Sequence, residues 1–212
     1  MEAFIGNQEI VQCEGVFDLF DSLYYAQEIT ELDLSNSGIT GSISQNIGNF
    51  TNLVSLNLSQ NEITGPIPAE IGNLFNLKEL KLFVNSLNGI LPSSISNLIN
   101  LEYFNVFNNQ ISGRIPMQIG NMAELKNFYI HQNLFYDTIP AELFELSNLV
   151  HLYLNDNDLV VDIGSNDGSL LKHFKSKGLK TIGVEPTNIS KIANENGITT
   201  IQSFFNEDIL II

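Results

Sequence analysis

The sequence predicts an α/β protein that is mainly a solenoid of stacked repeats, followed by a short segment of alternating strands and helices. Residues 51–74, TNLVSLNLSQNEITGPIPAEIGNL, carry a skeleton that returns every 24 residues. A period of this length is typical of stacked repeat architectures. A separate pattern begins near Asp158 and does not follow the repeat. We therefore expect an N-terminal cap segment over residues 1–28, a solenoid over 29–157 and a distinct segment over 158–212.

Four columns of the repeat define its register, three of them apolar and one asparagine. They are Ile29, Leu53, Leu77, Leu101, Leu125 and Leu149; Leu32, Leu56, Leu80, Phe104, Phe128 and Leu152; Leu34, Leu58, Leu82, Val106, Ile130 and Leu154; and Asn61, Asn85, Asn109, Asn133 and Asn157. Five or six copies of one pattern exceed what chance produces, so the repeat sets the fold.

The segment before the first repeat is predicted to be helical. In VFDLFDSLYYA, residues 16–26, the apolar side chains recur at helical spacings. A helix here would cover the open end of the stack, where a terminal repeat otherwise exposes its apolar interior.

Each repeat is predicted to begin with a strand and to turn at its asparagine. The alternation at Leu56 and Leu58 has the two-residue period of a strand. The asparagine amide can pair with backbone groups of neighbouring turns that would otherwise be buried without partners. Glycines such as Gly65 suit a bend that needs positive φ, and prolines such as Pro68 fix φ on the convex side.

These residues resemble the plant-type leucine-rich repeat, whose pattern reads LxxLxxLxLxxNxLxGxIPxxIGxL, over about residues 29–157. The resemblance implies a right-handed leucine-rich-repeat solenoid with a parallel sheet on its concave face, where members mostly bind peptides or protein surfaces. Three departures stand out: the chain has one cysteine and no tryptophan where the family cap carries a cysteine pair and a tryptophan, Asp137 replaces the glycine of the fifth repeat, and the sixth repeat stops after Leu159.

Alternation along the strands predicts which side chains face out of the concave sheet. By repeat they are Asp33 and Ser35; Asn57 and Ser59; Lys81 and Phe83; Asn105 and Phe107; Tyr129 and His131; Tyr153 and Asn155. Because neighbouring strands lie about 4.8 Å apart, we expect a ladder of rings from Phe83, Phe107 and His131 beside a second from Tyr129 and Tyr153. Tyr103 and His151 should flank them.

Two interpretations of these rings remain open. Contiguous exposed aromatics are typical of partner-binding surfaces, which predicts a protein or peptide site at Phe83, Tyr103, Phe107, Tyr129, His131 and Tyr153. Alternatively, the rings stabilise adjacent strands as cross-strand pairs. Acidic residues around this face, among them Asp33, Glu79 and Asp156, favour a basic or neutral ligand.

The C-terminal pattern predicts a partial Rossmann-like β-α-β-α-β segment. Strands are expected at DLVVDI (158–163), KTIGVEP (180–186) and ITTI (198–201), with helices over SLLKHFKSKG and NISKIANENG. The glycine-rich turn GSNDG at 164–168 would let a ligand approach the start of a helix. An acidic residue at the end of the second strand, Glu185, is placed to accept hydrogen bonds from ribose hydroxyls.

The run from 158 to 208 resembles class I S-adenosylmethionine-dependent methyltransferases, and among them the sugar C-methyltransferases, through VVDIGSNDG, GVEP and FFNE. The resemblance implies a cofactor site at Asp162, Gly164, Ser165, Asn166, Gly168 and Glu185. A full domain of this class has about seven strands, whereas this chain ends just beyond the expected third. We therefore expect an incomplete domain.

Composition narrows the function classes. The chain has 24 acidic and 9 basic residues, a net charge of −15. This balance argues against a nucleic-acid partner, which needs Lys and Arg to release counterions, and against docking on anionic lipid. No apolar run approaches the roughly 18 residues of a membrane span. The first residues, MEAFIGNQEI, lack the features of a secretory signal, which makes the cytoplasm the default expectation.

No catalytic or metal-binding residues are predicted independently of the resemblance. His131, His151 and His173 have no second ligand at helical spacing, and Cys13 has no CxxC partner. The leading hypothesis is a leucine-rich-repeat binding module with an inactive methyltransferase-like C-terminus. The alternative is a methyltransferase, or a remnant that binds S-adenosylmethionine, with the repeats as a targeting module. A third possibility is a fragment or fusion of unrelated halves.

Overall fold

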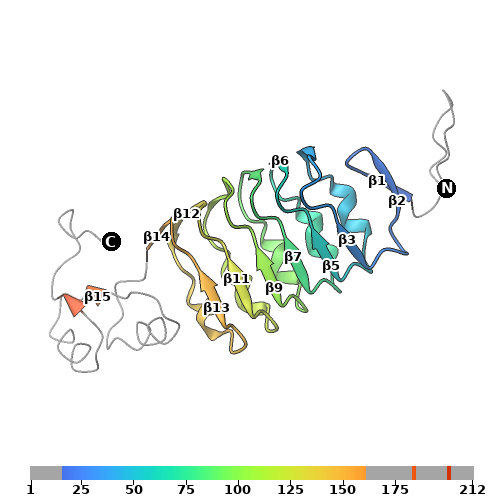
Figure 1. Ribbon diagram of the computed structural model, residues 1–212. Coiled ribbons are helices and arrows are strands. Elements are labelled where there is room, and N and C mark those ends of the chain that lie inside the picture. Colours follow the sequence, from blue (N-terminus) through green and yellow to red (C-terminus); the bar gives the residue numbers. More distant parts are fainter. Residues whose placement is uncertain (1–15, 161–182, 185–199, 202–212) are drawn as a thin grey trace, which may run out of the picture.

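The solenoid is a curved stack of parallel strands, one per repeat, shown in the computed structural model of Figure 1, which describes residues 16–160, 183–184 and 200–201. Six strands form one parallel sheet in the order β13-β11-β9-β7-β5-β3. They are β3 (Glu31–Asp33), β5 (Ser55–Asn57), β7 (Glu79–Lys81), β9 (Tyr103–Asn105), β11 (Asn127–Tyr129) and β13 (His151–Tyr153). The predicted repeat solenoid with a parallel sheet on its concave face is confirmed.

The strands stack in register because each repeat has the same length. Leu32 lies opposite Leu56, and Leu56 opposite Leu80, so the apolar column predicted from the sequence becomes a continuous buried row. The residues on either side of each buried strand residue point to the concave face. The 24-residue period therefore fixes both the core and the residues available on the opposite face of the sheet.

A second set of short strands runs along the side of the stack. One sheet has β4 (Thr40–Ser42), β6 (Glu62–Gly65) and β8 (Ser86–Leu87), and the other has β10 (Ser112–Gly113), β12 (Leu134–Thr138) and β14 (Asp158–Val160). A bridge between Ile90 and Ser112 links the two. Residues 158–160, predicted to open the methyltransferase-like strand, thus pair in parallel with β12 of the solenoid.

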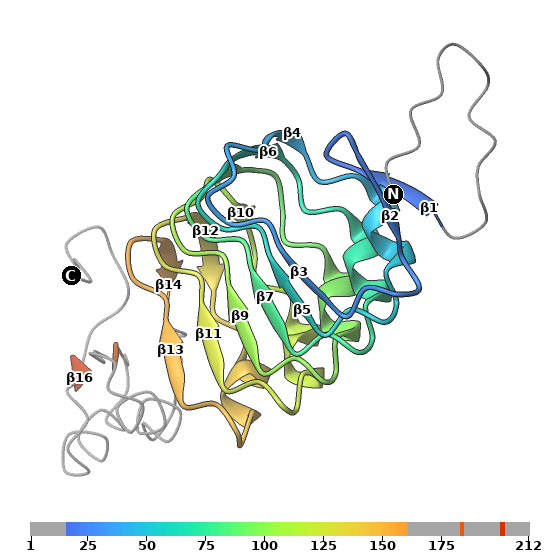
Figure 2. The same ribbon diagram turned by 45° about the vertical axis from the view of Figure 1, so that its right-hand side comes forward.

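In the described part of the chain, five 3₁₀ helices stack one on the next and close the repeats, as Figure 2 shows behind the six-stranded sheet. They are η1 (Gln45–Asn49), η2 (Ala69–Asn73), η3 (Ser93–Asn97), η4 (Met117–Asn121) and η5 (Ala141–Glu145). The Ser44 hydroxyl accepts a hydrogen bond from the Asn46 amide at the start of η1. The other four helices follow a proline, whose fixed φ suits the extended residue that precedes the helix.

The N-terminal segment is a β-hairpin, so the predicted helix over residues 16–26 is wrong. β1 (Val16–Leu19) pairs antiparallel with β2 (Ser22–Tyr25). The two turn residues, Phe20 and Asp21, both have positive φ, which is the geometry of a tight two-residue hairpin turn. The apolar residues fit a two-residue period as well as a helical one, and Leu19 is buried while Asp18 is exposed.

The hairpin packs on the first repeat. The Tyr24 and Phe50 rings meet edge to face with centroids 6.3 Å apart. The Asn46 side-chain amide donates to the Asp18 carbonyl at 3.3 Å. Leu19 and Ala26 are buried in the same core as the repeats, so the hairpin covers apolar surface of the first repeat.

The asparagine column bridges successive turns, as predicted. The Asn109 Oδ1 accepts from the Leu87 backbone N–H at 3.0 Å. Its Nδ2 donates to the carbonyls of Leu82 and Val106, both at 3.0 Å. Asn85, Asn133 and Asn157 repeat this pattern.

Asp137 takes over the glycine position of the bend and its backbone conformation. Its φ is 74°, against 75° to 88° for Gly41, Gly65, Gly89 and Gly113. Aspartate tolerates this left-handed region better than most side chains. Its carboxylate also forms an ion pair with Arg114, with an N–O distance of 2.6 Å.

Beyond residue 160, the structure describes two short strands. β15 (Gly183–Val184) pairs in parallel with β16 (Thr200–Ile201), within the ranges predicted for the second and third strands. The Rossmann-like segment as a whole stays a prediction. The predicted cofactor residues, Asp162, Gly164, Ser165, Asn166, Gly168 and Glu185, lie outside the described residues.

Candidate functional site

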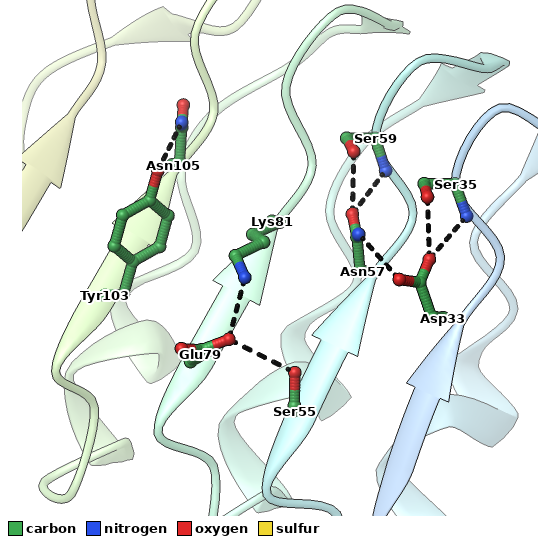
Figure 3. Close-up of polar contacts among 9 residues, drawn as sticks. All are labelled: Asp33, Ser35, Ser55, Asn57, Ser59, Glu79, Lys81, Tyr103 and Asn105. Atoms are coloured by element: carbon green, nitrogen blue, oxygen red, sulfur yellow. Dashed lines mark hydrogen bonds and ion pairs between the residues drawn. The ribbon is translucent and has the colours of Figure 1, made fainter.

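The concave face divides into a polar half over β3, β5 and β7 and an aromatic half over β9, β11 and β13. Figure 3 shows the polar half together with Tyr103 and Asn105 of β9; the bonds between Asp33 and Asn57 and between Ser55 and Glu79 link side chains of neighbouring strands. The outward positions predicted from the sequence supply both halves. The division follows from which residue types fill the same positions in early and late repeats.

The polar half begins with a network around Asp33. The Asp33 Oδ1 accepts from the Ser35 backbone N–H at 2.9 Å and from its hydroxyl at 2.7 Å. The Asp33 Oδ2 accepts from the Asn57 side-chain amide at 3.1 Å. The bonds from Ser35 are the main reason that the pKa of Asp33 lies below its ordinary value. Asp33 is therefore an exposed, ionised carboxylate in this half.

Lys81 connects the polar half to the aromatic half. Its Nζ lies 2.7 Å from the Glu79 Oε2, which also accepts from the Ser55 hydroxyl at 3.4 Å. The same Nζ lies 5.4 Å from the centroid of the Tyr103 ring. This is within the range of a cation–π contact.

Tyrosine rings form a contiguous surface over three adjacent strands. The Tyr129 ring lies 5.4 Å from Tyr103 and 5.0 Å from Tyr153, centroid to centroid. His151 flanks it at 6.5 Å. The predicted Tyr129–Tyr153 ladder and its flanking rings are present. We call Tyr103, Tyr129 and Tyr153 the tyrosine row.

A second pair of rings lies beside the tyrosine row. Phe107 and His131 stack with centroids 4.2 Å apart and planes 20° from parallel, and His131 lies 5.6 Å from Tyr153. Phe83 is half-buried and joins no ring contact among the described residues. The predicted three-ring ladder is therefore a stacked pair, and the ring surface starts at β9.

Burial changes the acid–base properties of the two central rings. The pKa of Tyr129 is raised, chiefly by burial and then by Tyr103 and Tyr153. The pKa of His131 is lowered, chiefly because burial disfavours the imidazolium, while Asp156 acts in the opposite direction. Among the described residues, the buried His131 Nδ1 has no hydrogen-bond partner.

The lowered pKa of His131 predicts a loss of stability in acid. The unfolded chain binds a proton near the ordinary histidine pKa of about 6.5. The folded chain binds it only at lower pH, so the contribution of neutral His131 is present above about 6.5 and is lost as pH falls through the folded pKa. We expect the urea midpoint to fall more from pH 8 to pH 5 in the wild type than in His131→Phe, which keeps a ring against Phe107. An equal fall in both proteins would contradict the assignment.

Charged side chains flank the strands at the start of the aromatic half. The Glu102 carboxylate lies 2.6 Å from Lys126 Nζ and 3.7 Å from Lys78 Nζ. The hydrogen bond and charge of Lys126 lower the pKa of Glu102, and Glu102 raises the pKa of Lys126. Being exposed, these pairs orient the side chains and add little stability.

The remaining predictions concern metal ligands, reactive side chains and membrane spans. In the part of the chain that the structure describes, no three His, Cys, Asp or Glu side chains gather where they could hold a metal ion. Cys13 and His173 lie outside that part. The described helices are too short to cross a bilayer. The contact of Lys81 with Tyr103 was not predicted, although Lys81 was expected to face outward and Tyr103 to flank the ladders of rings.

The Leucine Rich Repeat family model matches residues 28–50, 52–74, 76–98 and 100–122. Among solved structures, the GASSHO1/SCHENGEN3 receptor-kinase ectodomain from Arabidopsis thaliana, in complex with CASPARIAN STRIP INTEGRITY FACTOR 2, is 34% identical with a TM-score of 0.62; the match covers 64% of this chain and 16% of that one. The Arabidopsis HAESA ectodomain, in complex with an extended IDA peptide hormone, is 34% identical with a TM-score of 0.62, over 72% of this chain and 25% of that one.

Two further similarities are to a shorter ectodomain and to a methyltransferase. The BIR2 ectodomain from Arabidopsis is 28% identical with a TM-score of 0.56, over 61% of this chain and 68% of that one. The C-methyltransferase NovU of Streptomyces niveus is 40% identical over 55 residues, which are 26% of this chain and 13% of that protein. The chain thus spans only a small part of NovU and of the GASSHO1/SCHENGEN3 ectodomain.

Proposed function

We propose that this leucine-rich repeat protein binds an extended peptide, or an extended segment of a protein, across its concave face. The observation that carries the proposal is the tyrosine row, in which Tyr129 contacts both Tyr103 and Tyr153 across three adjacent strands. Contiguous aromatic side chains of this kind are favoured at protein interfaces, where tyrosine supplies a large apolar area and a polar end. An extended ligand suits the geometry because the face is a long row of parallel strands, and a ligand lying across it would meet one strand after another.

The dimensions of the sheet give the size of the ligand. Six strands about 4.8 Å apart span roughly 24 Å, and an extended peptide rises about 3.3 Å per residue. About seven residues would therefore cross the whole sheet, and about three would cross the tyrosine row. The ligand would meet the rings over β9, β11 and β13, and the serines, asparagines and Asp33 over the earlier strands.

The alternative role of the rings is to stabilise neighbouring strands. That role accounts for Phe104 and Phe128, which stack at 5.4 Å and are fully buried. It accounts less well for Tyr153, which leaves 48% of its surface exposed. Rings that only stabilised the fold would be expected to be buried, so the exposed surface of Tyr153 favours a binding partner.

The similar ectodomains support a peptide ligand. The HAESA and GASSHO1/SCHENGEN3 structures contain, by their descriptions, a peptide hormone and CASPARIAN STRIP INTEGRITY FACTOR 2. Those proteins have the same repeat architecture as this chain. The particular ligands belong to those proteins, and only their class, a peptide, enters the proposal for this chain.

A display selection tests the proposal. A random library of 12-residue peptides would be selected against the full chain, with Tyr129→Ala/Tyr153→Ala as the comparison. We expect recovery from the wild type to exceed recovery from the double variant at least tenfold, the ratio that a loss of about 1.4 kcal/mol produces. Equal recovery from both proteins would overturn the proposal.

A second candidate function is binding of S-adenosylmethionine by the C-terminal segment. The 55-residue match to a C-methyltransferase favours it, as does the GSNDG turn followed by Glu185. We propose that millimolar cofactor would raise the melting temperature of the full chain, and that Gly164→Val or Glu185→Ala would remove the rise. No shift in the wild type would count against this function and leave the first untouched.

A further inference from the structure

We propose that the ligand of the concave face is a basic peptide, with an arginine or lysine side chain lying against the rings of Tyr129 and Tyr153. This rests on the proposed function and adds the chemical class of its ligand. Three features of the described solenoid lead to it: the pairing of its basic side chains, the position of Lys81, and the exposed carboxylates at both ends of the face.

The solenoid has no unpaired lysine or arginine to receive an anionic ligand. Residues 16–160 contain four such side chains, and each has a carboxylate partner. Lys78 and Lys126 pair with Glu102, Lys81 with Glu79, and Arg114 with Asp137. A peptide rich in Asp or Glu would have to compete with these carboxylates, so charge complementarity favours the opposite sign.

Lys81 shows how a cation fits the tyrosine row. Its Nζ lies 5.4 Å from the Tyr103 centroid while it is paired with Glu79. Among the described residues, no lysine or arginine occupies the same position on Tyr129 or Tyr153, although both rings continue the row. A basic side chain of the ligand would repeat on these rings the contact that Lys81 makes on the first one.

Exposed carboxylates lie at both ends of the face. Asp156 follows the last strand, is exposed, and lies near enough to His131 to affect its protonation. At the other end, Glu31 and Asp33 are exposed on β3. A peptide with positive charges at both ends would thus meet carboxylates at each end and rings between them. Association should be faster at low salt, because exposed charges steer the ligand.

The inference can be tested by selecting three display libraries of 12-residue peptides against the full chain. The peptides are random except that the net charge is fixed at about +3 in one library, 0 in the second and −3 in the third. We expect the positive library to give the strongest enrichment. For a selected peptide, Tyr153→Leu should weaken binding roughly 5- to 10-fold, while Tyr153→Phe, which keeps the ring face, should stay within about twofold. Asp156→Asn should also weaken binding of the peptide. Asparagine is a suitable replacement because it removes the charge and tolerates the positive φ of 56° at this position.

The outcomes separate this inference from the proposed function. Enrichment of neutral or acidic peptides that still depend on Tyr129 and Tyr153 would overturn the basic class and keep the binding face. Enrichment of basic peptides with equal affinity for Tyr153→Leu would overturn the ring contact. No enrichment from any library would overturn both. Because Tyr153 is half-exposed, circular dichroism of Tyr153→Leu should match the wild type.

Discussion

Replacing Asn109 with alanine is expected to lower the free energy of unfolding by about 3 kcal/mol, a large fraction of what holds most domains folded. Asn109 is 8% exposed. Its amide joins two successive turns through the Leu87 N–H and through the carbonyls of Leu82 and Val106. The Leu82 and Val106 carbonyls keep other asparagine partners, from Asn85 and Asn133. The Leu87 N–H would be buried without its acceptor, which is the costly part.

Asn100→Ala is the matched control, because it removes an asparagine of the same solenoid that makes a single bond. The exposed Asn100 amide donates to the Phe75 carbonyl at 2.7 Å. Water can replace that bond, so we expect a loss of about 1 kcal/mol or less. Urea denaturation of both variants measures the difference. If Asn109→Ala lost no more stability than Asn100→Ala, the asparagine column would not be what joins the turns.

Gly72→Ala is expected to cost about 3 kcal/mol for a different reason, since overpacking a rigid core forces the backbone to move. A Cβ at Gly72 would lie 2.4 Å from the Ser94 carbonyl oxygen and 2.9 Å from its carbonyl carbon. These atoms belong to the next repeat, so η2 and η3 could not keep their spacing. Adding Ser94→Gly removes a side-chain contact at 2.7 Å and leaves the carbonyl in place. The double variant should therefore recover little.

Gly120→Ala offers a comparison at the equivalent position two repeats later. There the added Cβ would lie 2.7 Å from the Glu142 Cβ and 3.2 Å from its carbonyl oxygen. The backbone is farther away than at Gly72, so we expect a smaller loss, about 1–2 kcal/mol. Thermal or urea unfolding gives the ranking. A larger loss for Gly120→Ala would show that the distance to the neighbouring backbone does not control the cost.

The sequence predicts the solenoid well because its period is both local and repeated. Columns such as Leu32, Leu56 and Leu80 need only equal repeat length to stack, and the structure places them in register. The N-terminal hairpin could not be predicted in the same way. It occurs once, its apolar spacing fits helix and strand alike, and the positive φ of its turn residues, Phe20 and Asp21, is known only from the structure.

The candidate site could be predicted in part, for a related reason. The register brings Tyr129 opposite Tyr153, so that pair follows directly from the columns. Whether two rings stack depends on side-chain rotamers, which a column does not specify, and Phe83 joins no ring contact in the described chain. The contacts of Asp33 and Lys81 also depend on side-chain direction. A further ladder was missed, with Asn52, Asn76, Asn100 and Asn148 each donating to a carbonyl 25 residues earlier in the chain.

The most direct test of the binding face is titration calorimetry of one selected peptide with two matched variants. Tyr129→Ala/Tyr153→Ala removes two rings of the tyrosine row. Tyr136→Ala removes a tyrosine on β12 of the side sheet whose exposure, 50%, is close to the 48% of Tyr153. We expect the double variant to raise Kd at least tenfold and Tyr136→Ala to leave it within about twofold. A Kd that responds to Tyr136→Ala and not to the double variant would place the ligand away from the concave face and contradict the account.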